Sequence, residues 1–485
     1  MTTQAEARGA GGDNPFSWRF LTPMFMGSAL NPVNSSLIAT ALVPIATSMH
    51  ISVGRTAVLV SALYLASSIA QPTAGKLSEE FGPRRVFLVG ILLVLAGGLV
   101  GGFAQDLTTL VIGRVLIGVG TSAGYPSAML MVRRRATQAG LDGPPGGVLG
   151  GLVIAGMVTP ALGLPLGGVL VQAISWRASF FVNVPIALAT LVMAWIYVPR
   201  DPRAATTLTV AEVARRIDLA GIVTFGGTIT ALLVFLMALP RVSWAALAAV
   251  VVVGAVMIWW ELRASRPFFD SRLLGRNLAL SRTFLRWAIL GVCVYTVLYG
   301  LTQWLQAGRN LTALDAGLLL LPMTAASSVI ARPVSARNLL RAPLVVTAVA
   351  CLAGSLCVFV LTRSSSLALV IVVTLVFGVT LGTGASANQT ALYAQVPAEQ
   401  IGTASGLFRT WGYIGSIASS AIITLTFRNG VSDHGLHEIA AIMVAVSAVA
   451  LLLTVLDRQL MRQSRVERQS QAAPRQGEPT AERAG

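Results

Sequence analysis

The stretch from Gly75 to Arg85 reads GKLSEEFGPRR and lies between two long apolar segments of the chain. Charged side chains are costly in hydrocarbon, so this stretch is expected to lie in water between two membrane-spanning helices. Its two glycines are expected to let the chain turn tightly, with Glu79 facing basic residues across the turn. The sequence therefore predicts a short charged hairpin at a membrane surface, because the long apolar flanks disfavour a turn of a soluble protein.

The composition of the whole chain supports this interpretation. Hydrophobic residues make up 55% of the 485 residues and charged residues only 11%, and the mean hydropathy is +0.74. Soluble proteins carry about a quarter charged residues, and apolar stretches of about 20 residues recur along this chain. The pattern predicts an all-α polytopic membrane protein. The net charge of +16 is spread over many loops and does not indicate a nucleic-acid partner.

The cysteines and the N-terminus predict neither a disulfide framework nor a signal peptide. Cys293, Cys351 and Cys357 lie in apolar stretches, and no Cys/His cluster has the spacing of a zinc site. We therefore predict no metal site and no cofactor. The first fourteen residues are polar, and no short apolar stretch with a cleavage site follows them, so the first apolar segment is expected to be a retained helix.

Fourteen apolar segments are long enough to be membrane-spanning helices. They lie near residues 20–46, 57–77, 86–104, 107–131, 146–172, 178–198, 219–239, 243–261, 283–305, 314–331, 343–361, 366–393, 401–426 and 437–456. Most loops after even-numbered segments are rich in arginine, whereas loops after odd-numbered segments carry at most one arginine each. Because basic loops stay on the cytoplasmic side, both termini are expected to lie in the cytoplasm.

The segments also predict how the chain is divided. The predicted parts are a cytoplasmic N-terminal tail (1–15), a six-helix bundle (16–200), a central two-helix insertion with cytoplasmic linkers (201–282), a second six-helix bundle (283–457) and a cytoplasmic tail (458–485). The last part is rich in Arg, Gln, Pro and Ala, which predicts a disordered segment.

Several stretches resemble the major facilitator superfamily. The charged hairpin is similar to the signature Gly-x-Leu-x-Asp-Arg-x-Gly-Arg-Arg between that family's second and third helices, although a glutamate stands in the place of the aspartate. The matching positions of this cytoplasmic loop motif are Gly75, Leu77, Glu79, Gly82, Arg84 and Arg85. Further resemblances are WRASFFVNVP at 176–185, the stretch 261–273, and LQ at 305–306 followed by AGLLLLP at 316–322.

Six helices, an inserted pair and six more resemble the fourteen-helix drug:proton antiporter branch of this superfamily. The resemblance implies a major-facilitator fold arranged 6+2+6, in a monomer of the plasma membrane that is not an enzyme. ALGLPLGG at 161–168 is similar to the exporters' motif on helix five, with the proline displaced by one place. The matching positions are Gly163, Pro165, Gly167 and Gly168. They favour efflux, and close helix packing is their alternative role.

The acidic residues are the sharpest clue to mechanism. No Asp or Glu lies clearly at mid-membrane depth, and NSSLIATALVP at 34–44 lacks the carboxylate that the resembled family carries there. If transport is coupled to protons, Glu79 or Asp218 has to substitute for that acid. Arg114 and Arg409 lie within apolar helices, where a cation needs hydrogen-bond acceptors or a water-filled cavity.

The predicted coupling or gating residues are Glu79, Asp218, Arg114 and Arg409. Arg114 matches an arginine on the family's fourth helix, and its alternative role is a clamp that bonds backbone carbonyls or Asn34. Arg409 lies near a helix start, so its alternative role is that of a cation that snorkels to the membrane interface. Two cations in helices without a buried acid favour neutral or anionic substrates over cationic ones.

Polar and aromatic residues at helical spacing are candidates for a substrate cavity, although such residues also hold helices together. They are Asn31, Asn34, Gln71, Tyr125, Tyr295, Tyr299, Gln303, Asn388 and Gln389. The predicted function is secondary-active export of amphipathic small molecules, such as drugs or antibiotics, by proton antiport with alternating access. The alternative is a lipid or anionic-metabolite carrier or facilitator on the same fold that is not coupled to protons.

Other classes of function lack their motifs. No phosphate-binding GxxxxGK loop is present, which argues against ATP-driven transport. A membrane-embedded enzyme needs a buried cluster of His, Asp or Glu, but His50, His434 and His437 all lie near outer loops. A receptor or sensor is disfavoured because the tail is too short for a signalling domain.

Overall fold

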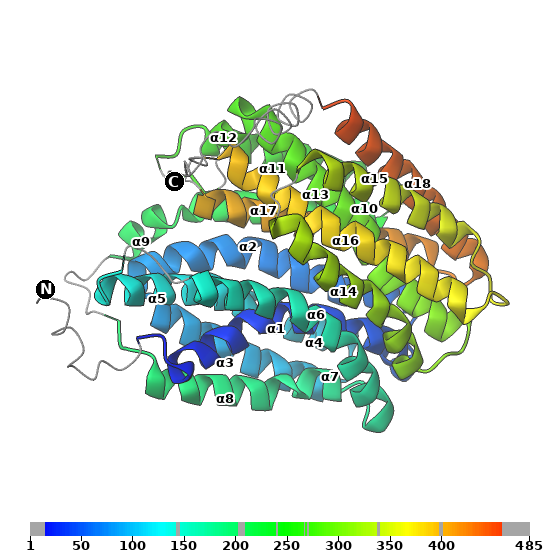
Figure 1. The fold of residues 1–485 in the computed structure, drawn as a ribbon, viewed down its shortest axis with the longest axis horizontal. Helices are drawn as coiled ribbons and strands as arrows, with labels where there is room; N and C mark the ends of the chain where they lie inside the picture. The colour runs from blue at the N-terminus through cyan, green and yellow to red at the C-terminus, as the bar shows by residue number, and fades with distance from the viewer. Residues whose placement is uncertain are drawn as a thin grey trace, which may run out of the picture.

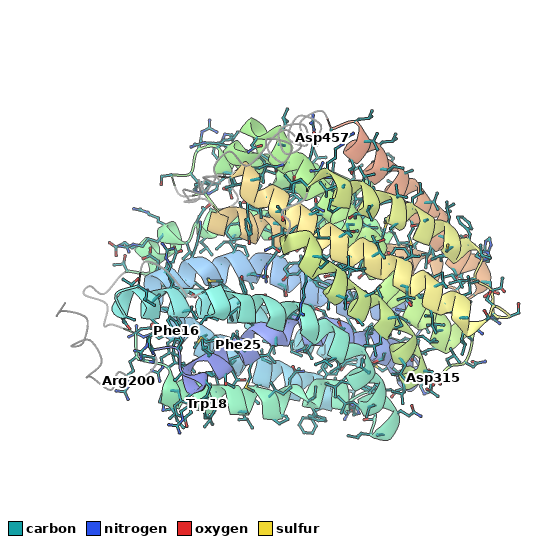
Figure 2. All side chains as sticks on the ribbon, viewed as in Figure 1. Phe16, Trp18, Phe25, Arg200, Asp315 and Asp457 are labelled. Carbon is teal, nitrogen blue, oxygen red and sulfur yellow. The ribbon has the colours of Figure 1, made fainter. Side chains whose placement is uncertain are left out.

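The computed structural model describes residues 15–141, 146–201, 209–238, 241–265, 267–268, 271–336, 340–396 and 401–457. Regular structure in these residues is helical throughout. Figure 1 shows two bundles of long helices, one built from the blue and cyan elements and the other mainly from the yellow to red ones. We call the side on which the first helix begins and the last one ends the terminal side. Trp18 and Arg200 lie on it, whereas Asp315 lies on the opposite side (Figure 2).

The first bundle consists of the helices that precede residue 200. They are α1 (Trp18–Ser48), α2 (Val58–Phe81), α3 (Pro83–Phe103), α4 (Leu107–Ser122), α5 (Gly124–Gln138), α6 (Gly146–Ala173), α7 (Ala178–Phe181) and α8 (Asn183–Tyr197). α4 and α5 follow one another almost without interruption, as do α7 and α8. A short 3-10 helix, Val53–Ala57, leads into α2.

The second bundle follows a central pair of helices. The central region holds α9 (Val210–Arg216), α10 (Leu219–Ala238), α11 (Trp244–Glu261) and α12 (Ser271–Arg276). The second bundle holds α13 (Leu278–Thr296), α14 (Ala313–Ala336), α15 (Arg341–Phe359), α16 (Leu367–Gln395), α17 (Ile401–Thr426) and α18 (Asp433–Val455). Two π-helical segments, Val297–Leu301 and Trp304–Gly308, extend α13.

Among the described residues, twelve helices are long and apolar enough to cross a membrane. α6 and α17 are not among the twelve, so the predicted count of fourteen spans stays a prediction. The predicted domain boundaries also stay predictions, and the tails 1–14 and 458–485 lie outside the described residues. Large apolar side chains such as Val251, Val252 and Trp259 on α11 are exposed, as expected for a surface that faces lipid.

Small residues bring neighbouring helices into backbone contact. A β-carbon added to Gly113 of α4 would lie 2.9 Å from the backbone nitrogen of Gly101 on α3, and one added to Gly97 would lie 2.8 Å from the Gly113 oxygen. Lipid supplies no hydrophobic drive for helix association, so close packing of this kind has to hold the helices together.

The charged hairpin is shorter than the sequence predicts. α2 continues to Phe81 and α3 begins at Pro83, which leaves Gly82 as the only residue between them. Gly82 has φ +97°, a conformation that favours glycine, and Pro83 supplies the fixed φ suited to the first position of a helix. The predicted break between the two helices, residues 78–85, is therefore too long, because exposed charged side chains reach water from the last turns of a helix.

Asp201, just after α8, caps the N-terminus of α3. Its carboxylate accepts hydrogen bonds from the backbone nitrogens of Arg84 (3.4 Å) and Arg85 (3.0 Å) and lies 3.4 Å from Nη1 of Arg134. A carboxylate at this place satisfies free N–H groups and interacts favourably with the helix dipole. The sequence analysis did not single out Asp201.

We expect Asp201→Ala to lower the free energy of unfolding by about 1 kcal/mol, because two amides at the helix start lose their acceptor. The measurement is thermal unfolding of the purified protein in detergent. Asp201→Asn keeps one acceptor oxygen and should lose clearly less stability. Equal stability of Asp201→Ala and the unmodified protein would contradict the capping role.

The central region is tied to the terminal-side end of α2. Arg216 Nη1 of α9 lies 2.6 Å from Oε2 of Glu80, and Lys76 Nζ donates to the Pro267 carbonyl at 3.0 Å. α9 itself starts in a capping box between Thr209 and Glu212. Hydrogen bonds from the Thr209 backbone and hydroxyl lower the pKa of the Glu212 carboxyl. α9 and the stretch after α11 therefore hold the hairpin in place.

Candidate functional site

A cavity of about 340 Å³ lies between the two bundles. This volume falls within the range of roughly 300–1,000 Å³ that is typical of sites for small organic ligands. Helices α1, α2, α4, α5 and α6 line it from the first bundle, and α13, α14, α16 and α17 from the second. The predicted site residues that line it are Asn31, Gln71, Tyr125, Tyr295, Gln389 and Arg409.

The bundles meet most closely on the opposite side. A β-carbon added to Gly168 of α6 would lie 2.6 Å from Cα of Leu314 on α14, and one added to Gly317 would lie 2.7 Å from the Leu164 carbonyl oxygen. The Thr424 hydroxyl also donates to the Gly54 carbonyl at 3.1 Å. The cavity lining reaches Tyr393, close to the terminal-side end of α16. The structure is therefore closed on the opposite side, and its cavity extends toward the terminal side.

The predicted motif on the fifth apolar segment lies at this closed contact. Gly163 and Gly167 face α1, where added β-carbons would lie 2.8 Å from Ser36 Cβ and 2.6 Å from the Leu37 oxygen. Gly168 faces α14 of the other bundle, as described above. Pro165 lies between them and is half-buried. The motif provides close packing within one bundle and across the two bundles (α6 and α14 in Figure 1).

A cluster of tyrosines joins the bundles, and two of its members, Tyr295 and Tyr413, form one wall of the cavity. The Tyr64 hydroxyl on α2 lies 3.1 Å from the Tyr299 hydroxyl, which donates to the Ser35 carbonyl at 2.8 Å. The Tyr64 ring also packs on Tyr295 and Tyr413, with centroids 5.2 and 5.3 Å apart. Tyr299 lies in the first π-helical segment of α13, and such segments are frequent at functional sites.

Arg114 lies behind this wall and does not line the cavity. Its side chain is 1% exposed, Nε donates to the Leu59 carbonyl at 3.1 Å, and Nη1 donates to the Asn34 carbonyl at 3.4 Å. Nη2 has no partner among the described residues. The Asn34 side chain is paired with Asn183 at 2.7 Å. This geometry is that of a clamp between α1, α2 and α4, and a role in coupling stays a prediction.

Arg409 is the one charged residue in the lining formed by the described residues. Its guanidinium lies over the ring of Tyr125, 4.1 Å from the centroid, so that α17 of one bundle contacts α5 of the other. The side chain is half-buried. The structure places it in the cavity, which differs from the alternative of an interfacial cation that points toward headgroups.

The two predicted acidic residues lie away from the cavity. Glu79 is exposed at the end of α2. Asp218 is buried at the start of α10, where it accepts hydrogen bonds from the backbone nitrogens of Gly221 (3.1 Å) and Phe268 (2.8 Å) and from the Trp260 indole (2.7 Å). Asp218 therefore ties the start of α10 to the end of α11 and to Phe268, which follows α11. The assignment of either residue to proton coupling remains a prediction.

The remaining predicted cavity residues are buried but are not part of the cavity lining. They are Asn34, Tyr299, Gln303 and Asn388. The sequence analysis missed lining residues that are aromatic, namely Trp287, Tyr393, Phe408 and Tyr413. Residue type alone does not separate these four from the aromatic residues that face lipid, because an aromatic side chain fits lipid and cavity equally well. No group of three or more potential metal-binding side chains is present in the described part of the chain.

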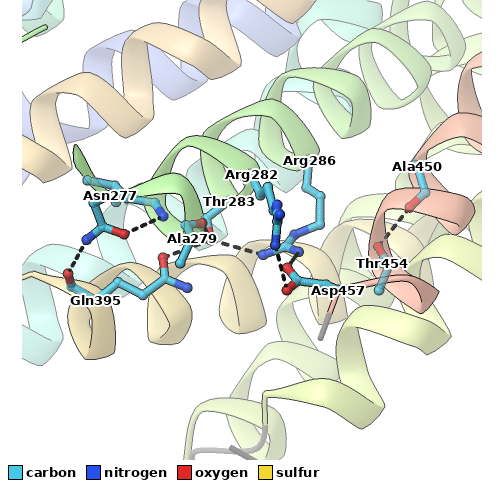
Figure 3. A network of polar contacts seen from close by, with 10 residues as sticks. Asn277, Ala279, Arg282, Thr283, Arg286, Gln395, Ala450, Thr454 and Asp457 are labelled. Carbon is cyan, nitrogen blue, oxygen red and sulfur yellow. Dashed lines mark hydrogen bonds and ion pairs between the residues drawn. The ribbon is translucent and has the colours of Figure 1, made fainter. Parts of the chain in front are cut away.

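A second polar network lies at the terminal-side end of the second bundle (Figure 3). Asp457, just after α18, binds Nη1 of Arg286 at 2.9 Å and Nη1 of Arg282 at 3.2 Å. Arg286 also donates to Thr283, whose hydroxyl donates to Oε1 of Gln395 at 3.0 Å. The network links α13, α16 and α18 outside the cavity, so it has a structural role.

Comparisons with known proteins agree with this architecture. A family model described as Major Facilitator Superfamily matches residues 24–420. An uncharacterized MFS-type transporter, YwoD of Bacillus subtilis, is 31% identical, with 91% of this chain and 97% of the relative covered. The tetracenomycin C resistance and export protein of Streptomyces glaucescens is 27% identical (86% and 77% covered). Multidrug resistance protein Stp of Mycobacterium tuberculosis is also 27% identical (75% and 67% covered).

Solved structures show the same fold at low sequence identity. The nucleoside transporter NupG superposes with a TM-score of 0.63 at 12% identity, over 90% of this chain and 99% of that one. A peptide transporter, POT, in complex with sulfate gives a TM-score of 0.62 at 16% identity, over 93% of this chain and 95% of that one.

Proposed function

Since this chain belongs to the Major Facilitator Superfamily, we propose that it is a secondary-active exporter of amphipathic small molecules, such as drugs or antibiotics, that works by alternating access. The observation that carries the proposal is the cavity between the bundles, which is closed on the opposite side and extends toward the terminal side. Rocking of the two bundles would expose such a cavity to each side in turn. Relatives named for resistance and export support the direction of transport.

The proposed topology completes this picture. We place the protein in the plasma membrane as a monomer with fourteen spans arranged 6+2+6, which adds α6 and α17 to the twelve apolar spans. The terminal side is assigned to the cytoplasm because the arginine-rich loops lie there. The cavity then opens to the cytoplasm in this structure, as needed to load a substrate for export.

Proton antiport is the proposed source of energy. Within the described residues no carboxylate lines the cavity, so a proton would have to bind elsewhere, at Glu79 or Asp218. Arg114 would connect such a site with the cavity, because it contacts carbonyls of α1 and α2, two helices that also line the cavity. Purified protein in liposomes, with an imposed pH gradient and an amphipathic dye, tests the proposal. Dye movement that requires the gradient supports antiport.

In this assay we expect Arg114→Met to reduce gradient-driven transport by at least about tenfold. Hydrogen bonds of a charged group contribute about 1.5–3 kcal/mol, and 1.4 kcal/mol corresponds to a factor of ten. Arg114→Lys keeps the charge and should retain part of the rate. The exposed Arg428, replaced by Met, is the matched control. Gradient-driven transport that is unchanged in Arg114→Met would contradict a coupling role.

A carrier or facilitator of anionic metabolites or lipids is the second candidate. One feature of the cavity favours a carrier of anions, because Arg409 is the one charged residue in the described lining. Substrate movement that ignores the imposed pH gradient, in protein that still binds the substrate, would favour this candidate over the antiporter.

A further inference from the structure

We infer that Arg409 and Tyr125 form the recognition site for the negatively charged group of an aromatic, amphipathic anion. The inference rests on the proposed function and specifies the substrate class of the same cavity. The ligands that fit are flat aromatic molecules with one carboxylate, sulfonate or similar anionic group.

The charge of Arg409 is not neutralised within the described part of the chain. No ion pair joins it to a described carboxylate, and no other charged residue is found in the lining. By contrast, Arg286 and Arg282, on α13 of the same bundle, both bind Asp457. A half-buried cation without a counter-ion attracts an anion strongly, because a low dielectric weakens screening.

The contact with Tyr125 leaves the hydrogen-bonding edge of the guanidinium uncovered, and the neutral Tyr413 hydroxyl is the described side-chain group that interacts with it. The aromatic ring covers one face of the planar group, at 4.1 Å from the centroid. The N–H donors point outward in the plane of the guanidinium, so they are not consumed by a ring stacked on its face. This fork of donors matches two oxygens of a carboxylate or sulfonate. Tyr125 therefore orients Arg409 for a bidentate contact.

The walls around this cation are aromatic. The Trp287 ring stacks on Phe408, with centroids 4.7 Å apart and an angle of 17° between the planes. Phe408 directly precedes Arg409 in α17, and both line the cavity. Tyr295 stacks on Tyr299 with an interplanar angle of 10°. Flat rings of a ligand can stack beside such surfaces, which bind the apolar part of the molecule.

Several neutral polar residues of the lining are hydrogen-bonded to other side chains. Asn31 donates to Ser67 and Thr121 at 3.2 and 3.0 Å, and the Tyr413 hydroxyl donates to Gln71 at 2.6 Å. The described lining contains no carboxylate that could compensate a cationic ligand, and Arg409 would repel such a ligand. A cavity discriminates by such repulsion as well as by attraction. The site therefore selects anions over cations.

Three dansyl compounds of one ring system test the inference: the sulfonate (negative), the amide (neutral) and dansylcadaverine (positive). Binding is measured by fluorescence with the protein in nanodiscs of zwitterionic lipid. The unmodified protein should bind the sulfonate at least about tenfold more tightly than dansylcadaverine. Arg409→Gln should weaken sulfonate binding about tenfold and change amide binding less than about twofold. Arg409→Lys, which lacks the fork, should give an intermediate affinity, and Arg428→Gln is the control for net charge.

Two results would overturn the inference. One is unaltered sulfonate affinity in Arg409→Gln, or no sulfonate binding by the unmodified protein. The other is an equal loss of all three ligands in Arg409→Gln, because that loss means a structural role. Transport of the same compounds in liposomes separates this inference from the proposed function. If the sulfonate binds through Arg409 but is not transported, the proposed export function is refuted and the anion site stands. If the amide or the cation is exported independently of Arg409, the anion site is refuted and the export function stands.

Discussion

Replacement of Gly168 by leucine is expected to reduce transport by at least about tenfold and to open the opposite side of the molecule. Gly168 on α6 lies against the backbone of Ala313 and Leu314 on α14, so an added β-carbon would already lie 2.6 Å from Cα of Leu314. Backbone atoms cannot move aside as a flexible side chain does. Overpacking of this kind costs about 1–3 kcal/mol, which shifts a two-state equilibrium about 5- to 150-fold.

The opening can be measured directly as a distance between the bundles. Nitroxide labels on the opposite side report on it by pulsed electron resonance once the native cysteines have been replaced. The labels are placed at Thr108, in the first turn of α4, and at Ser364, in the loop before α16, and both residues are exposed. We expect a longer distance in Gly168→Leu than in the unmodified protein. Gly275→Leu is the matched control, since an added β-carbon at Gly275 meets no atom within 4 Å. An unchanged distance in Gly168→Leu would contradict the prediction that the larger side chain forces the two bundles apart.

The long helices can be predicted from the sequence because hydrocarbon imposes a strict pattern on a chain. Each span needs about 20 apolar residues, and each polar loop must lie outside. α3 and α15, predicted at 86–104 and 343–361, lie at Pro83–Phe103 and Arg341–Phe359. The errors concentrate at the ends of helices, where the chain enters water. α2 continues through its charged residues to Phe81 because a helix in water is limited by capping and not by hydrophobicity.

The candidate site can be predicted only in part. Gln71 and Gln389 stand out because amide side chains are scarce in apolar helices, and both line the cavity. Tyr64 and Tyr413 do not stand out, although their contact helps to join the bundles. Their positions depend on how two bundles far apart in sequence pack together. The Tyr64 and Tyr299 hydroxyls, for example, belong to residues that are 235 positions apart.

Polar contacts outside the cavity are equally hidden from the sequence. Asp201 accepts a hydrogen bond from Arg85 in the first turn of α3, 116 positions earlier in the chain. Asp457 binds Arg286, which is 171 positions earlier. Arg286 lies inside a segment that the apolar pattern predicts as a span, near residues 283–305. The pattern identifies the segment, but it cannot show that a carboxylate from the end of α18 neutralises the arginine.

That buried ion pair carries the second large prediction. Asp457→Leu is expected to lower the free energy of unfolding by about 3–5 kcal/mol. Asp457 and Arg286 are 3% and 4% exposed, so loss of the carboxylate leaves Arg286 charged, buried and unpaired. Arg282 would lose its partner too, but it is more exposed and can reach water. Thermal unfolding in detergent should show a fall in Tm of roughly 10 °C.

A double variant separates the pair from the packing around it. Arg286→Met in the Asp457→Leu background removes the unpaired charge and keeps an apolar side chain of similar length, so most of the lost stability should return. Glu438→Leu is the matched control, because Glu438 pairs with His434 at an exposed surface and its loss should change Tm little. A double variant that is no more stable than Asp457→Leu would contradict this prediction. It would show that the Asp457 carboxylate stabilises the fold through Arg282 or through backbone packing, and not by neutralising Arg286.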